Sequence, residues 1–190
     1  MKTGRLEAFS DGVLAIIITI MVLGMSAPEG YHFEALKPVI PSFLTYVLSF
    51  IYVGIYWNNH HHLFQAVNRV NGKILWANLN LLLWLSLFPF ATDWLGKNHF
   101  EANPSAIYGL VLLLAAIAFK ILVICVIKSD GKDSHIGRIY KKDKRMNWSL
   151  ILYAAGVLLS FLFPIVSLCI YLGVALMWIV PDPRIEKTIK

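Results

Sequence analysis

Side chains able to do chemistry gather near the ends of three apolar segments of this sequence. Carboxylates and histidines can transfer protons, and amides and indoles can hold them in place by hydrogen bonds. Because the rest of each segment is apolar, these polar groups are the first candidates for a functional site. In chain order they are Arg5, Ser10, Asp11, Trp57, Asn58, Asn59, His60, His61, His62, Trp76, Asn78 and Asn80.

The run His60-His61-His62 suggests a metal site at first sight. Three consecutive residues of a helix point about 100° apart, so they cannot all bind one ion, and the pattern disfavours a structural metal. The sequence also has no nucleotide-binding glycine loop, no zinc-protease His-Glu-x-x-His motif and no supported Ser/His/Asp set. It therefore predicts neither an enzyme nor a bound cofactor.

The composition points to a membrane protein. Hydrophobic residues make up 58% of the 190 residues and charged residues only 15%, whereas soluble domains are about one quarter charged. The apolar residues fall in blocks of the length that a bilayer core requires. We expect an all-α membrane protein with a single domain over residues 1–190 and six transmembrane helices. The predicted spans are 6–25, 38–61, 74–95, 104–127, 147–163 and 165–180.

The last two spans come from one uncharged stretch over residues 147–180. As one helix it would be about 51 Å long, which exceeds a bilayer core of about 30 Å. Pro164 lies at its middle, where a helix interior tolerates proline poorly. We therefore expect two short helices joined by a tight turn near Pro164.

The basic residues predict the orientation. With the N-terminus inside, 14 of the 17 lysines and arginines fall in cytoplasmic segments, and only Lys37 and Lys97 fall outside. Both termini are then cytoplasmic. The net charge of +6 is accounted for as an orientation signal, so we expect membrane lipid as a partner and no nucleic acid.

This orientation places the polar ends of the first three spans at one depth. Unpaired polar groups are costly in a bilayer, so mutual hydrogen bonds are expected. One interpretation is a structural network at the interface. Another is that the layer holds a pore-lining helix in register, or that His60, His61 or Asp11 acts as a titratable switch.

The first span also carries an apolar stripe at helical spacing. Gly12, Ile16, Thr19 or Ile20, and Leu23 recur on one face, with Ala15 beside them. A lipid-facing stripe, a packing stripe and a pore lining would all show this pattern. Periodicity alone does not choose among them.

The string Arg5-Leu6-Glu7-Ala8-Phe9-Ser10-Asp11 resembles the R-x-x-x-F-S-D signature that opens the first helix of the transmembrane protein 175 family. This family comprises endolysosomal potassium channels and their bacterial relatives. The apolar continuation after Gly12 and the run Trp57–His61 also resemble that family. The resemblance implies a potassium-permeable channel in a bacterial plasma (inner) membrane, with K⁺ passing transiently through a pore.

The resemblance also implies an assembly and roles for residues. Vertebrate members carry two six-helix repeats and dimerise, so a chain with one repeat implies a homotetramer with its first helices around a central pore. Ile16 matches the hydrophobic constriction, which Ile20 and Leu23 would complete, and Thr19 matches a hydroxyl linked to potassium preference. The group implied as a structural brace is Arg5, Phe9, Ser10 and Asp11, bonded to Trp57, His60, His61 and Asn78.

Two other functions stay open at this point. One is a proton-coupled small-solute transporter that uses Asp11 and the His60–His62 cluster. Transporters typically bind their substrates and coupling ions near the midplane of the bilayer, whereas this polar layer is offset toward the cytoplasm. The other is a membrane-embedded enzyme that uses the histidines, for which no convergent catalytic set is visible.

Overall fold

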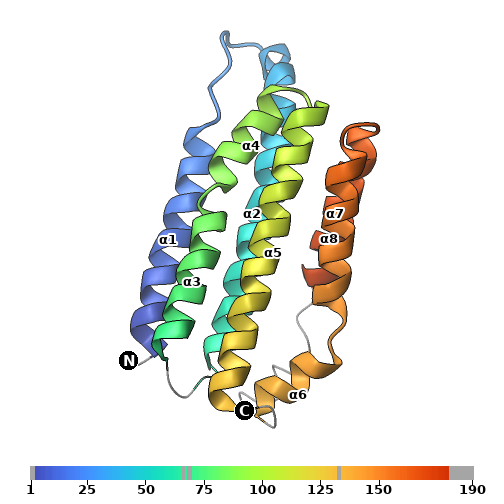
Figure 1. Ribbon diagram of the computed structural model, residues 1–190. Helices are drawn as coiled ribbons and strands as arrows, with labels where there is room; N and C mark the ends of the chain where they lie inside the picture. Colours follow the sequence, from blue (N-terminus) through green and yellow to red (C-terminus); the bar gives the residue numbers. More distant parts are fainter. Residues whose placement is uncertain (1–2, 66, 68–69, 132–133, 180–190) are drawn as a thin grey trace.

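The computed structural model describes residues 3–65, 67, 70–131 and 134–179 (Figure 1). Within these residues all regular secondary structure is helical. The elements are α1 (Thr3–Leu23), the 3-10 helix η1 (Phe33–Val39), α2 (Ile40–Gln65), α3 (Gly72–Leu85), α4 (Phe88–Lys97), α5 (Ala102–Asp130), α6 (His135–Lys142), α7 (Arg145–Leu159) and α8 (Pro164–Ile179).

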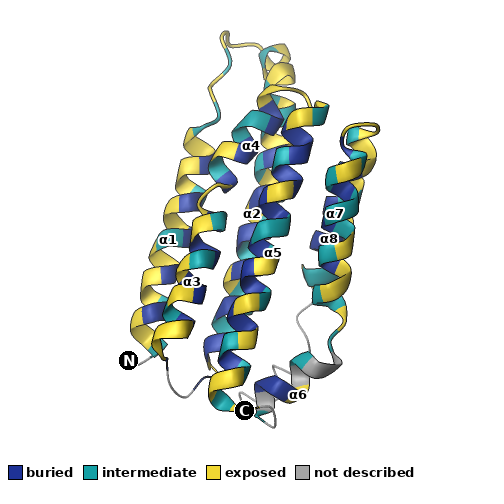
Figure 2. Ribbon diagram, viewed as in Figure 1, coloured by how far each residue is buried: buried dark blue, intermediate teal, exposed yellow. Residues whose placement is uncertain are grey.

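The long helices stand side by side in one bundle (Figure 1). We call the end at which α1 begins, α2 ends, α3 begins and α5 ends the motif end. Helix α5 is the centre of the bundle, because it packs against α3, α4, α7 and α8. Buried residues recur along the whole length of α5, while α1 and the α7–α8 hairpin keep long exposed faces (Figure 2).

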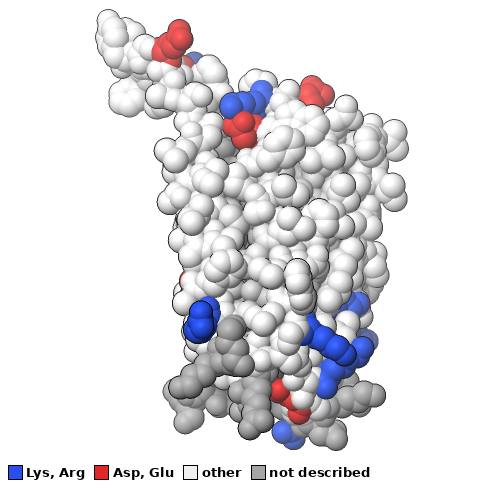
Figure 3. Space-filling model, turned by 60° about the vertical axis from the view of Figure 1, so that its left-hand side comes forward, with Lys and Arg blue, Asp and Glu red and all other residues white. Residues whose placement is uncertain are grey.

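The architecture suits a membrane. Among the described residues, four helical stretches are long and apolar enough to cross one: Thr3–Leu23, Phe33–Gln65, Gly72–Lys97 and Ala102–Asp130. Helices α7 and α8 are apolar but shorter. On the face shown in Figure 3, charged side chains gather toward the two ends and leave an almost uncharged zone between them. The prediction of an all-helical protein with apolar helices of membrane-spanning length is thus confirmed.

The predicted third span, 74–95, is broken into two helices. Helix α3 ends at Leu85 and α4 begins at Phe88, with Pro89 in the first turn of α4. A proline cannot donate to the carbonyl four residues earlier, and its ring clashes with that carbonyl. This explains why the helix breaks at Ser86 and Leu87. The Ser86 hydroxyl donates to the carbonyl of Leu83 at 2.7 Å and so closes the end of α3.

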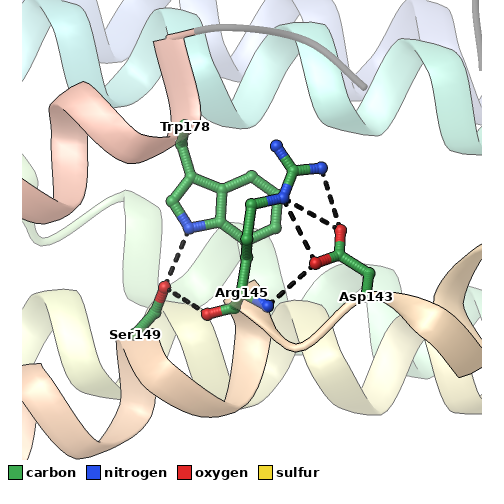
Figure 4. Close-up of polar contacts among 4 residues, drawn as sticks. All are labelled: Asp143, Arg145, Ser149 and Trp178. Atoms are coloured by element: carbon green, nitrogen blue, oxygen red, sulfur yellow. Dashed lines mark hydrogen bonds and ion pairs between the residues drawn. The ribbon is translucent and has the colours of Figure 1, made fainter. Parts of the chain in front are cut away.

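The α7–α8 hairpin turns at residues 160–163, and α8 begins at Pro164, where the sequence predicts the turn. At the motif end, a group of contacts that we call the clasp joins the beginning of α7 to the end of α8 (Figure 4). The Arg145 guanidinium pairs with Asp143 at 2.9 Å and lies 4.8 Å from the centre of the Trp178 ring. The Trp178 indole in turn donates to Ser149 Oγ at 2.8 Å. The clasp fixes α8 against the beginning of α7.

Buried tyrosines fasten this hairpin to the bundle. The Tyr153 hydroxyl donates to the Tyr52 hydroxyl at 3.3 Å, and the Tyr52 hydroxyl donates to the carbonyl of Tyr171. The Tyr171 ring lies directly against Gly109 of α5 and Gly156 of α7, where a Cβ would overlap it. These glycines provide the space that lets α8 approach α5 and α7.

Candidate functional site

Helix α1 has two faces of different character. The face toward the bundle carries Leu6, Ser10, Leu14, Ile17 and Met21, which recur every three or four residues and are all buried. The opposite face carries the predicted pore residues. Ile16, Ile20 and Leu23 are 58%, 48% and 80% exposed in the single chain, and Thr19 is exposed as well.

The predicted pore residues therefore form one continuous apolar strip on the outer side of α1. Gly12 and Ala15, which the sequence places beside them, are also exposed. The Thr19 hydroxyl donates to the carbonyl of Ile16 at 2.8 Å, so its proton is already used and its oxygen remains available as an acceptor. Such a strip can face lipid or other copies of the chain.

A buried polar chain holds the inner side of α1 at the motif end. The Ser10 hydroxyl donates to the carbonyl of Leu6 at 2.9 Å and accepts from Asn78 Nδ2 at 3.0 Å. The Asn78 Oδ1 atom lies 2.7 Å from His60 Nε2. Because a carbonyl oxygen only accepts, His60 carries a proton on Nε2 in this arrangement. One chain of bonds thus links α1, α3 and α2, and all three side chains are buried.

Asp11 makes a separate bond on the next face of α1. Its Oδ1 atom accepts from Trp57 Nε1 of α2 at 3.0 Å. The Trp57 ring stacks on His61, with ring centroids 6.0 Å apart and planes 10° apart. His61 Nε2 lies 2.7 Å from Gln65 Nε2. Unlike the Ser10 chain, this contact lies at the exposed surface of the single chain.

Arg5 and Phe9, the other residues of the predicted brace, do not join these bonds. Both are exposed, and they line an open groove of about 440 Å³ between α1 and α3, opposite Leu75, Trp76 and Leu79. Arg5 makes no hydrogen bond or ion pair with any other described residue. Within one chain, the motif therefore braces α1 through Ser10 and Asp11, and its Arg5 and Phe9 side chains face outward.

Asn59 and Asn80, two other polar residues of the predicted layer, bond to partners within their own helices. Asn59 Nδ2 donates to the carbonyl of Ile55 at 2.8 Å, and Trp84 Nε1 donates to Asn80 Oδ1 at 3.2 Å. Across the described residues, no three His, Cys, Asp or Glu side chains lie together as metal ligands would. The layer is a set of helix-to-helix hydrogen bonds around Ser10, Asp11, His60 and Asn78.

A second polar contact, which the sequence analysis did not single out, holds the other half of α1. The Thr92 hydroxyl lies 3.7 Å from Met21 Sδ and 2.7 Å from Ser49 Oγ, and Ser49 also bonds Tyr108 at 3.0 Å. These contacts join α1 to α4, α2 and α5. The sequence feature that could have predicted this contact is the presence of small hydroxyl residues inside apolar spans, which commonly mark helix contacts in membranes.

The comparisons with known proteins agree with this geometry. A family model described as "Endosomal/lysosomal potassium channel TMEM175" matches residues 5–89, which contain α1 from Arg5 onward, α2 and α3. The "Potassium channel HX13_20290" of Chryseobacterium sp. (strain P1-3) is 54% identical over 190 residues, covering 100% of this chain and 99% of the relative.

Two further similarities cover different parts of the chain. The "Potassium channel B446_29190" of Streptomyces collinus is 37% identical over 129 residues, 64% of this chain and 63% of that protein. A crystal structure described as a lysosomal potassium-selective channel TMEM175 homolog from Chamaesiphon minutus superposes with a TM-score of 0.77 at 29% identity. That superposition covers 93% of this chain and 96% of the other.

Proposed function

The chain belongs to the TMEM175 family, and from this premise we propose that it is a potassium-permeable cation channel, a homotetramer in which α1 lines a central pore. Membership in a family of channels sets aside the membrane-embedded enzyme. The relatives described above carry the name potassium channel, which supports K⁺ as the permeant ion.

The observation that carries the proposal is the division of α1 into a bonded face and a bare face. Ser10 and Asp11 tie one side of the helix to α3 and α2, and Met21 contacts Thr92 farther along. The strip from Ile16 to Leu23 lies uncovered on another side. A helix fixed from behind with a bare apolar strip suits a position at the axis of a symmetric assembly, where four strips would face one another.

In this assembly Ile16, Ile20 and Leu23 form a hydrophobic constriction, and Thr19 contributes a hydroxyl near its narrowest part. A narrow apolar ring excludes water, and a modest widening restores water and ion passage, so such a ring can act as a gate. K⁺ gives up part of its hydration shell more readily than Na⁺, which accounts for a modest preference for potassium.

Six spans with both termini in the cytoplasm complete the proposal. The 14 basic residues assigned to inside segments support a cytoplasmic position for the motif end, in a membrane that we assign as the bacterial inner membrane. Helices α7 and α8, with 15 and 16 residues, are each about 23 Å long. Local thinning of the bilayer and interfacial side chains such as Trp148 and Trp178 can accommodate spans of that length.

Purified protein in planar bilayers under opposed potassium and sodium gradients tests the function. We expect discrete single-channel steps with a reversal potential shifted toward that of potassium. The alternative, a proton-coupled small-solute transporter using Asp11 and the His60–His62 cluster, predicts slow, saturable flux driven by a pH gradient and no steps. The bond between His60 and Asn78 and the position of the polar layer at the motif end weigh against that alternative.

A further inference from the structure

A groove of about 940 Å³ opens between α3 and α5 at the motif end, and Trp76 of α3 lines both this groove and the one that contains Arg5. Its two halves differ in character. Asn71, Lys73, Lys128 and Ser129 line the half nearest the motif end. The half that extends toward the middle of the bundle is lined by Ala77, Ile121 and Cys125, together with Asn80, whose Oδ1 atom accepts from Trp84 Nε1. The pore proposed above does not use any of these residues.

The polar half of the groove is held in a fixed shape. Asn71 is the N-cap of α3: its Oδ1 atom accepts from the backbone N–H of Ile74 at 3.0 Å. Its Nδ2 atom donates across the groove to Ser129 Oγ of α5 at 3.1 Å. This bond fixes the beginning of α3 against the end of α5, and so sets the separation of the lysines that each helix carries.

The charge in this half is positive. Lys73 lies in the first turn of α3 and Lys128 in the last turn of α5, and both are exposed. Neither forms an ion pair with any described carboxylate. Asp130 lies two residues beyond Lys128 but is not among the lining residues. The first turn of α3 adds the partial positive charge of a helix N-terminus.

The mainly apolar half continues the groove along α5, away from the motif end. From Lys128 to Ile121 the wall runs two turns of α5, about 10 Å. Ile121 is exposed, and the Trp76 side chain at the rim is 75% exposed. Tryptophan at this depth is typical of the membrane interface, where its ring lies at the level of the lipid headgroups.

We propose that this groove binds one anionic phospholipid. The headgroup phosphate lies between the Lys73 and Lys128 ammonium groups, and the first part of an acyl chain lies along Ala77, Ile121 and Cys125. Two lysines that form no ion pair with a described carboxylate attract a lipid of net negative charge, whereas the choline of a zwitterionic lipid offsets its own phosphate. The groove thus matches an anionic lipid both in charge and in the order of its polar and apolar halves.

The two free cysteines provide the test, because Cys125 lines the groove and Cys169 lies exposed on α8. The full-length protein in mild detergent is titrated with phosphatidylglycerol or with phosphatidylcholine of the same acyl chains. N-ethylmaleimide then labels both cysteines, and mass spectrometry gives the two rates. We expect phosphatidylglycerol to slow the labelling of Cys125 selectively, and native mass spectrometry to show the bound lipid.

Substitutions locate the charge requirement. Lys73→Gln with Lys128→Gln should weaken phosphatidylglycerol protection at least tenfold, since each interfacial lysine contributes about fivefold. Arg138→Gln with Lys144→Gln removes the same charge from the motif end outside the groove and should leave the protection unchanged. Lys73→Arg with Lys128→Arg should retain it, which separates a loss of charge from a failure to fold.

Four results would overturn the proposal. They are equal protection by phosphatidylcholine, equal loss in the Arg138/Lys144 control, protection by inorganic phosphate alone, and protection of Cys125 that follows oligomer formation without lipid. The third result would indicate a plain phosphate site and the fourth a second copy of the chain in the groove. None of these outcomes depends on ion conductance, so the channel proposal stands or falls separately.

Discussion

The indole nitrogen of Trp57 donates a hydrogen bond to Asp11 Oδ1 at 3.0 Å and joins the beginning of α1 to the end of α2. The preceding residue, Ser10, bonds Asn78 of α3. Consecutive side chains on a helix point about 100° apart, so two adjacent residues tie α1 to two different helices. The short motif therefore fixes both the position of α1 and its rotation about its own axis.

Breaking the Trp57–Asp11 bond should impair assembly more than permeation. Trp57→Phe and Asp11→Ala should each lower the free energy of unfolding by about 1 kcal/mol, and the double variant by less than the sum. Size-exclusion chromatography should show a lower yield of the assembled form, with single-channel conductance unchanged in what assembles. Trp148→Phe, at an exposed indole of α7, is the matched control. A normal assembly yield with altered conductance would refute the role as a brace.

Removing the amide of Asn78, the central residue of the Ser10–Asn78–His60 hydrogen bonds, should lower the free energy of unfolding more than breaking the Trp57–Asp11 bond does. Asn78→Leu keeps the approximate volume but leaves the His60 Nε2 proton and the Ser10 oxygen without their partner, at a cost of about 1–3 kcal/mol. Thermal unfolding in detergent measures this loss. Asn58→Leu, at a residue of the same region that makes no hydrogen bond to another described residue, should change the unfolding temperature little. If the two substitutions lowered the unfolding temperature equally, the stabilising role of the Ser10–Asn78–His60 hydrogen bonds would be contradicted.

A polar group at the proposed constriction should make the channel leak. In Ile16→Asn the amide stabilises water in the narrow ring, and lowering the barrier by about 1.4 kcal/mol raises the flux about tenfold. Liposome flux of K⁺ and Na⁺ should rise and lose its preference for K⁺. Ile16→Val keeps the ring apolar and should leave the K⁺ and Na⁺ fluxes low. Unchanged conductance and ion preference in Ile16→Asn would rule out this residue as pore lining.

Adding one methyl group beneath Tyr171 should loosen the α7–α8 hairpin. Gly156→Ala and Gly109→Ala each place a Cβ within the Tyr171 ring or hydroxyl, an overpacking that costs about 1–3 kcal/mol. Gly173→Ala adds the same methyl group to α8 where no other atom lies within 4 Å, and should be neutral or mildly stabilising. Unfolding temperatures of the three variants test the prediction, and a stable Gly156→Ala variant would contradict the packing described.

The sequence by itself predicted the features that follow from local composition. Long apolar blocks with few charges require helices in a membrane, and Pro164 within an uncharged stretch requires a turn. The spacing of Ile16, Ile20 and Leu23 placed them on one face, because the helical period relates such positions without any knowledge of their neighbours. The resemblance carried by Arg5–Asp11 led to the family that the comparisons establish.

Only the tertiary structure decided which polar groups meet. The sequence placed Ser10, Asp11, His60 and Asn78 at one depth, but hydrogen bonds depend on the rotation of each helix and on which helices are neighbours. Those are set by packing between residues far apart in the chain, such as Tyr171 against Gly109. The family resemblance grouped Arg5 and Phe9 with the brace, whereas in the structure both are exposed and Ser10 and Asp11 make the bonds to α3 and α2.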